Sequence, residues 1–265
     1  MAFFESRTSR ILVSAAGLLI VAAVGAWVGF YLTFLRDLPD LNSGEDYRPP
    51  IASRVLDRDG VVIGSFFEQR RTLVELEGIP DHVVQAFVAG EDSAFFEHSG
   101  IDYRSILRAA WVNLRAGGEI KQGASTITQQ MVKTFLLASK KTYSRKFKEL
   151  ILAKRVEDSL SKQDILYLYL NQINYGRAYG IQEAAQVYFG KAVDRITLAE
   201  AALLTGLPQS PARLDPYRYP ERALRRRSYV LKQMLKHSKI DDKAYEKAVA
   251  SPLKLDWRKK DSTLD

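Results

Sequence analysis

Ten consecutive residues gather three carboxylates and a histidine around two aromatic rings. From position 91 to position 100 the chain reads Glu-Asp-Ser-Ala-Phe-Phe-Glu-His-Ser-Gly. A carboxylate beside aromatic rings is partly removed from water, and desolvation together with a neighbouring carboxylate raises its pKa toward that of a useful base. Charged residues that flank core aromatics are also common at exposed helix ends. The stretch alone therefore leaves a general base and an ordinary helix terminus open.

Basic residues dominate a second region of the chain. Residues 133–162 contain nine Lys or Arg and three acidic residues. A run of charge is usually a solvated helix face. One of the acids, Glu149, lies inside the basic run and four residues after Arg145, which places both side chains on one side of a helix. Glu149 is therefore a second carboxylate of interest.

Composition limits the class of protein. The chain has 265 residues, 46% of them hydrophobic and 26% charged, which suits one large or two small globular domains with a substantial core. It has no cysteine, which excludes disulfides and thiolate metal sites. The net charge of +8 favours an anionic partner such as nucleic acid, a membrane surface or a phosphorylated substrate. Composition does not choose among these.

An apolar run at residues 11–35 predicts a transmembrane helix. It has 25 residues without a charge, which as a helix would span about 37 Å and cross a hydrocarbon core of about 30 Å at a tilt. Arg7 and Arg10 precede the run and acidic residues follow it, so we expect residues 1–10 in the cytoplasm and the rest of the chain outside. A cleaved signal peptide is the competing interpretation, but the run is long for one.

A linker and a small β-hairpin are expected next. Residues 36–51 are typical of a linker. Two short β-prone runs, Arg54–Asp57 and Val61–Phe67, flank an Asp-Gly pair at positions 59 and 60, which favours a hairpin turn. Residues 72–74 could add a third short strand. Such a sheet is too small to form the core.

From Pro80 onward the apolar spacing predicts helices. We expect them at about residues 80–91, 103–116, 126–137, 143–160, 165–170, 181–189, 198–207, 221–237 and 242–250. Thr197 and Glu200 have the spacing of a capping box, and Asp102 and Ser125 are expected to cap the helices that follow them. Four prolines at positions 208 to 220 predict an ordered, extended loop. The expected fold is mainly α, with a small β-hairpin appendage and one N-terminal transmembrane helix.

The expected helix at residues 103–116 has an ambiguous apolar face. Trp111 and several aliphatic residues lie on one side, and arginines edge it. An apolar face edged by arginines could lie in a membrane interface. The spacing alone supports an ordinary core-facing helix equally well.

Five blocks of sequence, taken in order, carry a family resemblance. The first is the stretch at 91–100. The next two read Gly-Ala-Ser-Thr-Ile-Thr-Gln-Gln at 123–130 and Arg-Lys-Phe-Lys-Glu at 145–149. The last two run from 165 to 191, with Tyr-Leu-Asn at 169–171, and from 200 to 211, with Glu-Ala-Ala-Leu-Leu and Gly-Leu-Pro-Gln. Together they resemble the peptidoglycan glycosyltransferase domain, glycosyltransferase family 51, of class A penicillin-binding proteins and monofunctional transglycosylases.

This resemblance covers residues 52–250 and implies a fold and an activity. The fold would be helical and lysozyme-like, with a second lobe partly sunk in the membrane. The activity would be an inverting hexosyl transfer that polymerises lipid II, a disaccharide-pentapeptide on a polyprenyl pyrophosphate, into glycan strands. Class A proteins continue into a transpeptidase domain, so residues 251–265 would lead toward such a part in a longer protein. A monofunctional enzyme is the alternative.

The resemblance also assigns roles to residues. Glu91 matches the general base that takes the proton of the acceptor hydroxyl, and Glu149 matches a second essential carboxylate near the donor pyrophosphate, often linked to a divalent cation such as Mg²⁺ or Mn²⁺. Leaving-group charge requires cations opposite the base. We predict that substrate is bound by Ser125, Thr126, Gln129, Gln130, Lys133, Arg145, Lys146, Asn171 and Tyr175. Orienting roles are predicted for Asp92, Phe95 and His98.

One departure from the family pattern concerns Tyr167, where many members carry an acidic residue, so the role of that acid is not carried over.

The implied partners are lipid II, the growing glycan strand and membrane lipids, with cell-wall synthesis proteins as further candidates. The implied location is the cytoplasmic (inner) membrane, crossed once, with the catalytic domain extracytoplasmic.

Three other functions compete with this one. A lytic, lysozyme-like hydrolase would act on finished glycan but has no use for a cluster of cations at a leaving pyrophosphate. A catalytically inactive membrane scaffold would keep the fold without the reaction. A non-enzymatic protein could bind anionic lipid or nucleic acid, and the expected topology argues against nucleic acid.

Overall fold

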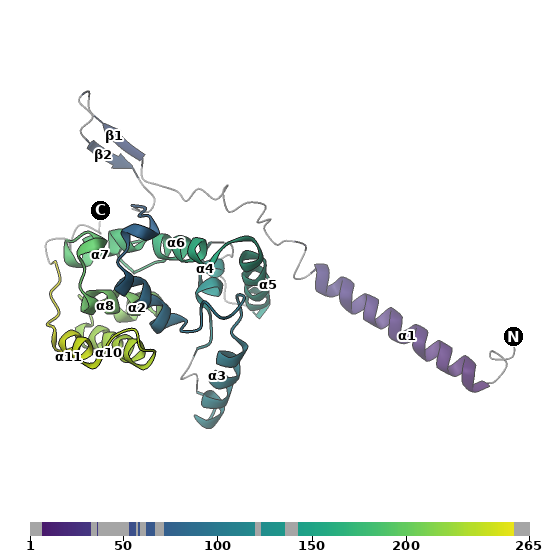
Figure 1. The fold of residues 1–265 in the computed structure, drawn as a ribbon. Helices are drawn as coiled ribbons and strands as arrows, with labels where there is room; N and C mark the ends of the chain where they lie inside the picture. Colours follow the sequence, from purple (N-terminus) through teal and green to yellow (C-terminus); the bar gives the residue numbers. More distant parts are fainter. Residues whose placement is uncertain are drawn as a thin grey trace.

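The computed structural model describes residues 7–32, 36, 53–56, 58, 62–66, 72–119, 123–135 and 143–256. Within these residues the chain is mainly helical, with one two-stranded sheet. The mainly α fold with a small β-hairpin, expected from the sequence, is confirmed. Figure 1 shows the helices from α2 onward gathered together, with α1 extending from them.

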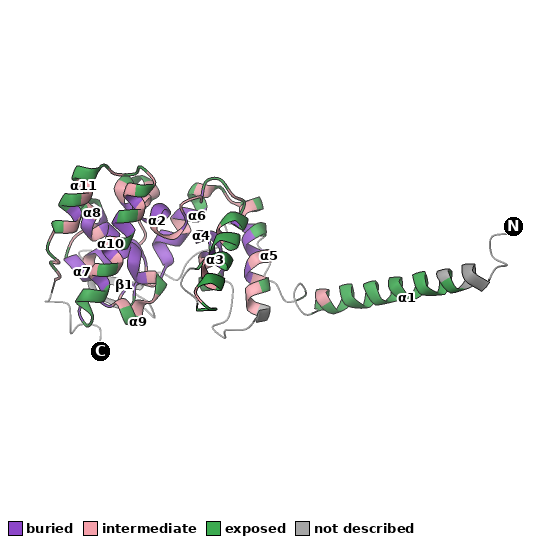
Figure 2. Cartoon of the chain, turned by 90° about the horizontal axis from the view of Figure 1, so that it is seen from below, coloured by how far each residue is buried: buried purple, intermediate pink, exposed green. Residues whose placement is uncertain are grey.

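The first helix, α1, runs from Arg7 to Phe30. Its segment Val13–Phe30 is long and apolar enough to cross a membrane, and none of it is buried inside the protein. Figure 2 shows this helix almost entirely exposed. The helix overlaps the apolar run predicted at residues 11–35 and begins four residues earlier, while residues 33–35 and the expected linker, apart from Arg36, lie outside the described residues.

The hairpin pairs β1, Ser53–Leu56, antiparallel to β2, Val62–Phe66, with Ser53 opposite Phe66. The predicted turn at residues 59 and 60 lies outside the described residues. The third strand predicted at residues 72–74 is wrong. Val74 instead exchanges two hydrogen bonds with the Asn171 side chain: its N–H donates to Oδ1 at 2.8 Å and its carbonyl accepts from Nδ2 at 2.9 Å. A side-chain amide has taken the place of a neighbouring strand.

Three helices make the centre of the helical body: α2, Asp81–Glu91; α8, Leu198–Gly206; and α10, Pro220–Lys236. Every residue of α8 except Leu198 and Glu200 is buried, as expected for a helix that is apolar on all sides. Its start is the predicted capping box, in which the Thr197 and Glu200 side chains each accept from the other's backbone N–H. The helix α11, Asp242–Ala250, packs against α10.

A second group of helices stands beside the first. The helix α4, Ile127–Phe135, packs against α5, Tyr143–Ser159, and α6, Lys162–Gln172. The helix α6 starts three residues earlier than expected because Ser161 and Asp164 form a capping box. It leads through a turn to α7, Ile181–Phe189, whose bounds agree with the prediction. Short 3₁₀ turns at Leu76–Gly78 and Val193–Arg195 precede α2 and α8.

The proline-rich segment is not the extended loop predicted from the sequence. It contains a 3₁₀ turn, Leu207–Gln209, and a short helix α9, Pro211–Leu214. Pro208, Pro211 and Pro220 each lie in the first turn of a helical element. In a first turn the missing N–H of proline would have had no helical partner, so the ring fits without loss.

The helix α3, Tyr103–Arg115, projects away from the other helices (Figure 1). It starts at the predicted cap, where the Asp102 side chain accepts from Ser105 N–H at 2.9 Å. Its apolar side is uncovered: Leu107, Trp111 and Leu114 are 72%, 56% and 73% exposed. The core-facing interpretation of this helix is therefore wrong, because of its residues only Ala109 is buried.

Candidate functional site

Glu91 is the last residue of α2, at the junction of the two helix groups. The residue before it is Gly90, where a Cβ atom would come within 2.8 Å of Cγ2 of Thr205 on α8 and 3.2 Å of Cγ1 of Val230 on α10. A larger residue would push α2 away from both helices. Glycine therefore allows the close packing that places Glu91 next to α10.

The Glu91 carboxylate is held from two sides. Nε2 of Gln130 on α4 donates to Oε2 at 2.7 Å, and Nη2 of Arg226 on α10 donates to Oε1 at 2.9 Å. The Glu91 side chain is only 7% exposed. Burial raises the pKa of Glu91 above its ordinary value, and Arg226, the Gln130 hydrogen bond and Lys133 oppose that rise. A carboxylate with a raised pKa that is still ionisable is what a general base at neutral pH requires.

Two buried tyrosines are part of the surroundings of the base. The Tyr169 hydroxyl donates to Oε1 of Gln130 at 3.3 Å and so holds the amide in the orientation that presents Nε2 to Glu91. Tyr175 is fully buried and has no hydrogen-bond partner for its hydroxyl among the described residues. Burial raises the pKa of both tyrosines well above the ordinary value, and the charge of Glu91 adds to the rise. Both therefore stay protonated beside the base.

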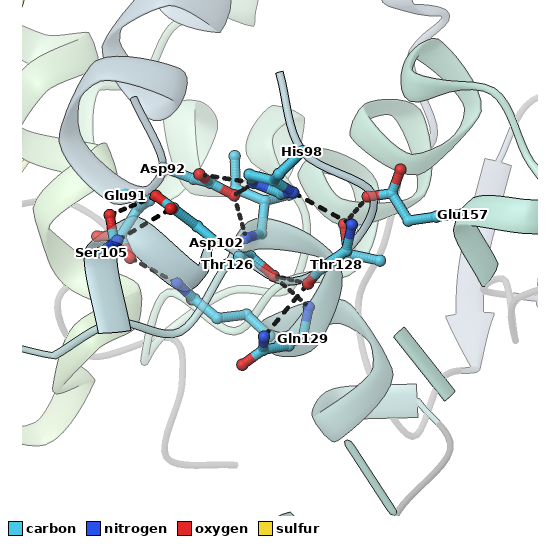
Figure 3. Close-up of polar contacts among 12 residues, drawn as sticks. Glu91, Asp92, His98, Asp102, Ser105, Thr126, Thr128, Gln129 and Glu157 are labelled. Carbon is cyan, nitrogen blue, oxygen red and sulfur yellow. Dashed lines mark hydrogen bonds and ion pairs between the residues drawn. The ribbon is translucent and has the colours of Figure 1, made fainter. Parts of the chain in front are cut away.

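Asp92 joins the end of α2 to the start of α4. Its Oδ2 accepts from the backbone N–H of Ile127 at 3.0 Å, and both of its oxygens lie 3.0 Å from Nε2 of His98 (Figure 3). The N–H of Gly100 donates to Nδ1 of His98 at 3.1 Å, so Nδ1 must be unprotonated and Nε2 must carry the proton that goes to Asp92. His98 thus orients the Asp92 carboxylate.

The carbonyl of Gly100 ties the first block to the second. It accepts from the Thr126 hydroxyl at 2.7 Å and from Nε2 of Gln129 at 3.2 Å. Thr126 Oγ1 also accepts from Gln129 N–H at 3.2 Å, which makes Thr126 the N-terminal cap of α4. The prediction that Ser125 caps this helix is therefore wrong. Phe95, predicted to orient the site, is fully buried, and its ring packs edge-on against His98.

Glu149 is buried and carries two cationic partners from its own helix. Nη1 of Arg145 donates to its Oε1, and Nζ of Lys146 donates to its Oε2 at 2.9 Å. Lys146 also reaches Oε1 of Gln129 at 3.0 Å and Oγ of Ser125 at 3.1 Å. The three side chains therefore bring α5 against the start of α4 and form a small cluster of charge.

Lys133, on α4, interacts electrostatically with both carboxylates. Desolvation of its amine lowers the pKa of Lys133. The charges of Arg145 and Lys146 lower that pKa further, whereas those of Glu149 and Glu91 raise it. The side chain still reaches solvent. Lys133 thus links the cations of α5 electrostatically to the base.

The residues around Glu149 do not fit a resident divalent cation. Both of its oxygens already accept from a cationic side chain, and the described residues contain no group of three or more His, Cys, Asp or Glu that could hold a metal. Mg²⁺ is commonly bound by one or two carboxylates together with substrate phosphates. A metal cation at Glu149 would lie against Arg145 and Lys146, whose positive charges oppose it.

Asn171 and Tyr175 were predicted to bind substrate, and the structure places both inside the protein. The Asn171 side chain is used by Val74 and by the carbonyl of Tyr167, which accepts from Nδ2 at 2.9 Å. Asn171 therefore fastens the chain before α2 to α6. Tyr175 packs edge-on against Phe87 behind the base.

With this geometry in hand, comparison with known proteins decides the family. The model of the Transglycosylase family matches residues 59–235. The chain belongs to the transglycosylase family. The match includes every residue of the site just described.

Curated relatives agree with that assignment. Penicillin-binding protein 1A of Aquifex aeolicus is 47% identical over 245 residues, which are 92% of this chain and 34% of that protein. Penicillin-binding protein 1A of Escherichia coli is 44% identical over 228 residues, 86% of this chain and 27% of that protein. A crystal structure of penicillin-binding protein 1A from Haemophilus influenzae is 27% identical, with a TM-score of 0.47, over 79% of this chain and 22% of that one. The chain thus spans between 22% and 34% of the length of these relatives.

Two residues near the base of this transglycosylase were missed by sequence reasoning. Arg226 lies in a run of three arginines on α10, 135 residues after Glu91, and the sequence offers no signal that separates it from its neighbours. Tyr169 belongs to the fourth block, but its spacing is that of a core residue. A partly buried pair that ties α5 to the first block was missed as well: Lys162 contacts Glu157 at 2.8 Å and the His98 carbonyl at 2.7 Å.

Proposed function

We propose that this chain is a membrane-anchored peptidoglycan glycosyltransferase that joins lipid II units into glycan strands and releases polyprenyl pyrophosphate. The observation that carries the proposal is a buried glutamate of raised pKa, Glu91, beside a separate cluster of cations around Glu149. The transglycosylase family and the penicillin-binding protein 1A relatives support the same activity. The exposed apolar helix α1 supports the anchor.

The proposed reaction begins at Glu91. Its carboxylate takes the proton of the acceptor sugar hydroxyl while that oxygen attacks the donor sugar and the pyrophosphate leaves from the opposite face. Gln130 and Arg226 each donate to one oxygen of the carboxylate, so each oxygen keeps a lone pair that can accept a proton. Inversion follows because attack and departure occur on opposite faces.

The leaving pyrophosphate is assigned to Lys133, Arg145 and Lys146. Charge grows on its oxygens as the bond breaks, and fixed cations stabilise that charge without reorganisation. Glu149 aligns Arg145 and Lys146 by accepting from each of them. Glu149 therefore orients these two cations.

The test of this function is polymerisation of labelled lipid II by the full chain in detergent, with separation of the glycan products on a gel. We expect Glu91→Gln to reduce kcat by roughly 10²- to 10⁴-fold, the usual contribution of a general base. Glu97→Gln is the matched control, because Glu97 is an exposed carboxylate in the same stretch. Near-normal polymerisation by the Glu91 variant would refute the assignment of the base.

A lytic activity on finished peptidoglycan is the second candidate, because a carboxyl of raised pKa could also act as a general acid. Release of soluble fragments from purified cell wall would favour it over polymerisation. Activity with and without a chelator measures any contribution of a divalent cation. Reporter fusions at each end of α1 test the proposed orientation, in which the N-terminus is cytoplasmic and the catalytic domain extracytoplasmic.

A further inference from the structure

A groove of about 690 Å³ lies along α9 and α10 and adjoins the base. Four of the residues that line it are arginines: Arg213 on α9, and Arg222, Arg225 and Arg226 on α10. Among the described residues that line this groove none is acidic. We call this surface the arginine groove. Its charge suits an anionic group.

Neighbouring groups leave much of this charge available. Arg222 lies over the ring of Tyr219 at 4.8 Å and Arg226 over the ring of Tyr229 at 4.6 Å. A ring face orients a guanidinium without using its N–H donors. Arg225 lies 3.6 Å from the carboxylate of Glu221, whose side chain is 87% exposed. Such an exposed pair neutralises little of the charge of Arg225 in water.

Arg226 connects the arginine groove to Glu91, since one guanidinium both lines the groove and donates to the carboxylate. Gln130, on α4, holds the other oxygen of Glu91, so the arginine groove meets one oxygen of the base and α4, which carries Lys133, meets the other. In an inverting displacement the attacking group approaches from the face opposite the leaving group. The arginine groove is therefore on the side from which an acceptor arrives.

We propose that the arginine groove binds an oxyanion group of the acceptor, either its pyrophosphate or the carboxylates of its peptide. This inference rests on the polymerase function proposed above. Guanidinium groups suit both sources, because their paired N–H donors match the oxygens of phosphates and carboxylates. Held there, the acceptor would present its hydroxyl to Glu91.

The test measures lipid II polymerisation by the full chain in detergent, comparing wild type with Arg213→Ala combined with Arg222→Ala. Both side chains are exposed, so we expect the fold to be unchanged, and thermal unfolding checks this. Arg195→Ala is the matched control, an 80% exposed arginine outside the groove. We expect the double variant to raise KM roughly tenfold with little change in kcat, as for a group that binds substrate without contributing to the chemical step.

Three substrates separate the two sources of the oxyanion: lipid II, lipid II with amidated peptide carboxylates, and the same carrier with the disaccharide but no peptide. If the groove binds carboxylates, the double variant loses its defect on the second and third substrates. If it binds pyrophosphate, the defect is equal on all three. A KM no different from that of Arg195→Ala on lipid II would overturn the groove proposal while leaving the polymerase function standing. If wild type itself makes no glycan, both proposals fall.

Discussion

Replacement of Arg226 by glutamine removes a positive charge whose Nη2 lies 2.9 Å from Oε1 of Glu91. The two side chains are 16% and 7% exposed, so solvent screens this pair poorly. Burial already raises the pKa of Glu91, and Arg226 is the strongest influence that opposes the rise. Without Arg226 the pKa of Glu91 moves further up.

The sign of the pH dependence follows from linkage. A carboxyl whose pKa is higher in the folded than in the unfolded state binds more protons when folded, so its contribution to stability falls as pH rises between the two values. Arg226→Gln extends that range upward. Removing one partner of a buried ion pair costs about 3–5 kcal/mol while the other stays charged. We expect Arg226→Gln to lower the free energy of unfolding by about 3 kcal/mol at about pH 8. At about pH 5, where Glu91 can take up a proton, we expect a decrease of about 1 kcal/mol.

Urea unfolding of the full chain in detergent at both pH values measures this difference. Arg225→Gln is the matched control. Arg225 is the residue before Arg226, its side chain is 69% exposed, and it lies 3.6 Å from the carboxylate of Glu221. We expect that variant to change the free energy of unfolding by less than about 0.5 kcal/mol at either pH. The acidic limb of the rate profile of Arg226→Gln should also move to higher pH, because the base works only when deprotonated.

Equal losses of stability at the two pH values would refute this electrostatic account of Glu91. So would a loss for Arg226→Gln no larger than that for Arg225→Gln. Either result would mean that the Glu91 carboxylate is not held as an ion in the folded protein.

Two further predictions concern the surroundings of the base and the projecting helix. Tyr169→Phe removes the hydroxyl that orients Gln130, and we expect kcat to fall about three- to tenfold; lower stability with an unchanged kcat would show that the hydroxyl serves packing alone. Leu107→Ser with Leu114→Ser removes two apolar side chains that are 72% and 73% exposed, so we expect thermal unfolding to be nearly unchanged and binding of a version without α1 to anionic lipid vesicles to weaken several-fold. Unweakened binding would show that α3 does not contact the membrane.

Local patterns in the sequence predicted much of the secondary structure. The bounds of α7 and α11, the caps at Asp102 and Thr197, and the pairing of two short strands follow from residues close together in the chain. Caps and turns depend on interactions across a few positions, so the sequence displays them directly. The third strand failed because a distant group intervened: the Asn171 side chain took the backbone bonds of Val74.

The sequence by itself determined which residues carry the chemistry: the Glu91 stretch, the basic run around Glu149, and an apolar N-terminal segment. Charge and residue type along the chain are enough to identify these candidates. Tertiary structure decided which of them meet. The partner of Glu91 on α10 is Arg226, 135 positions away, and the apolar face of α3 stays exposed because no element among the described residues covers it. Packing between distant helices sets burial, and burial sets the pKa of the base, so neither can be read from spacing alone.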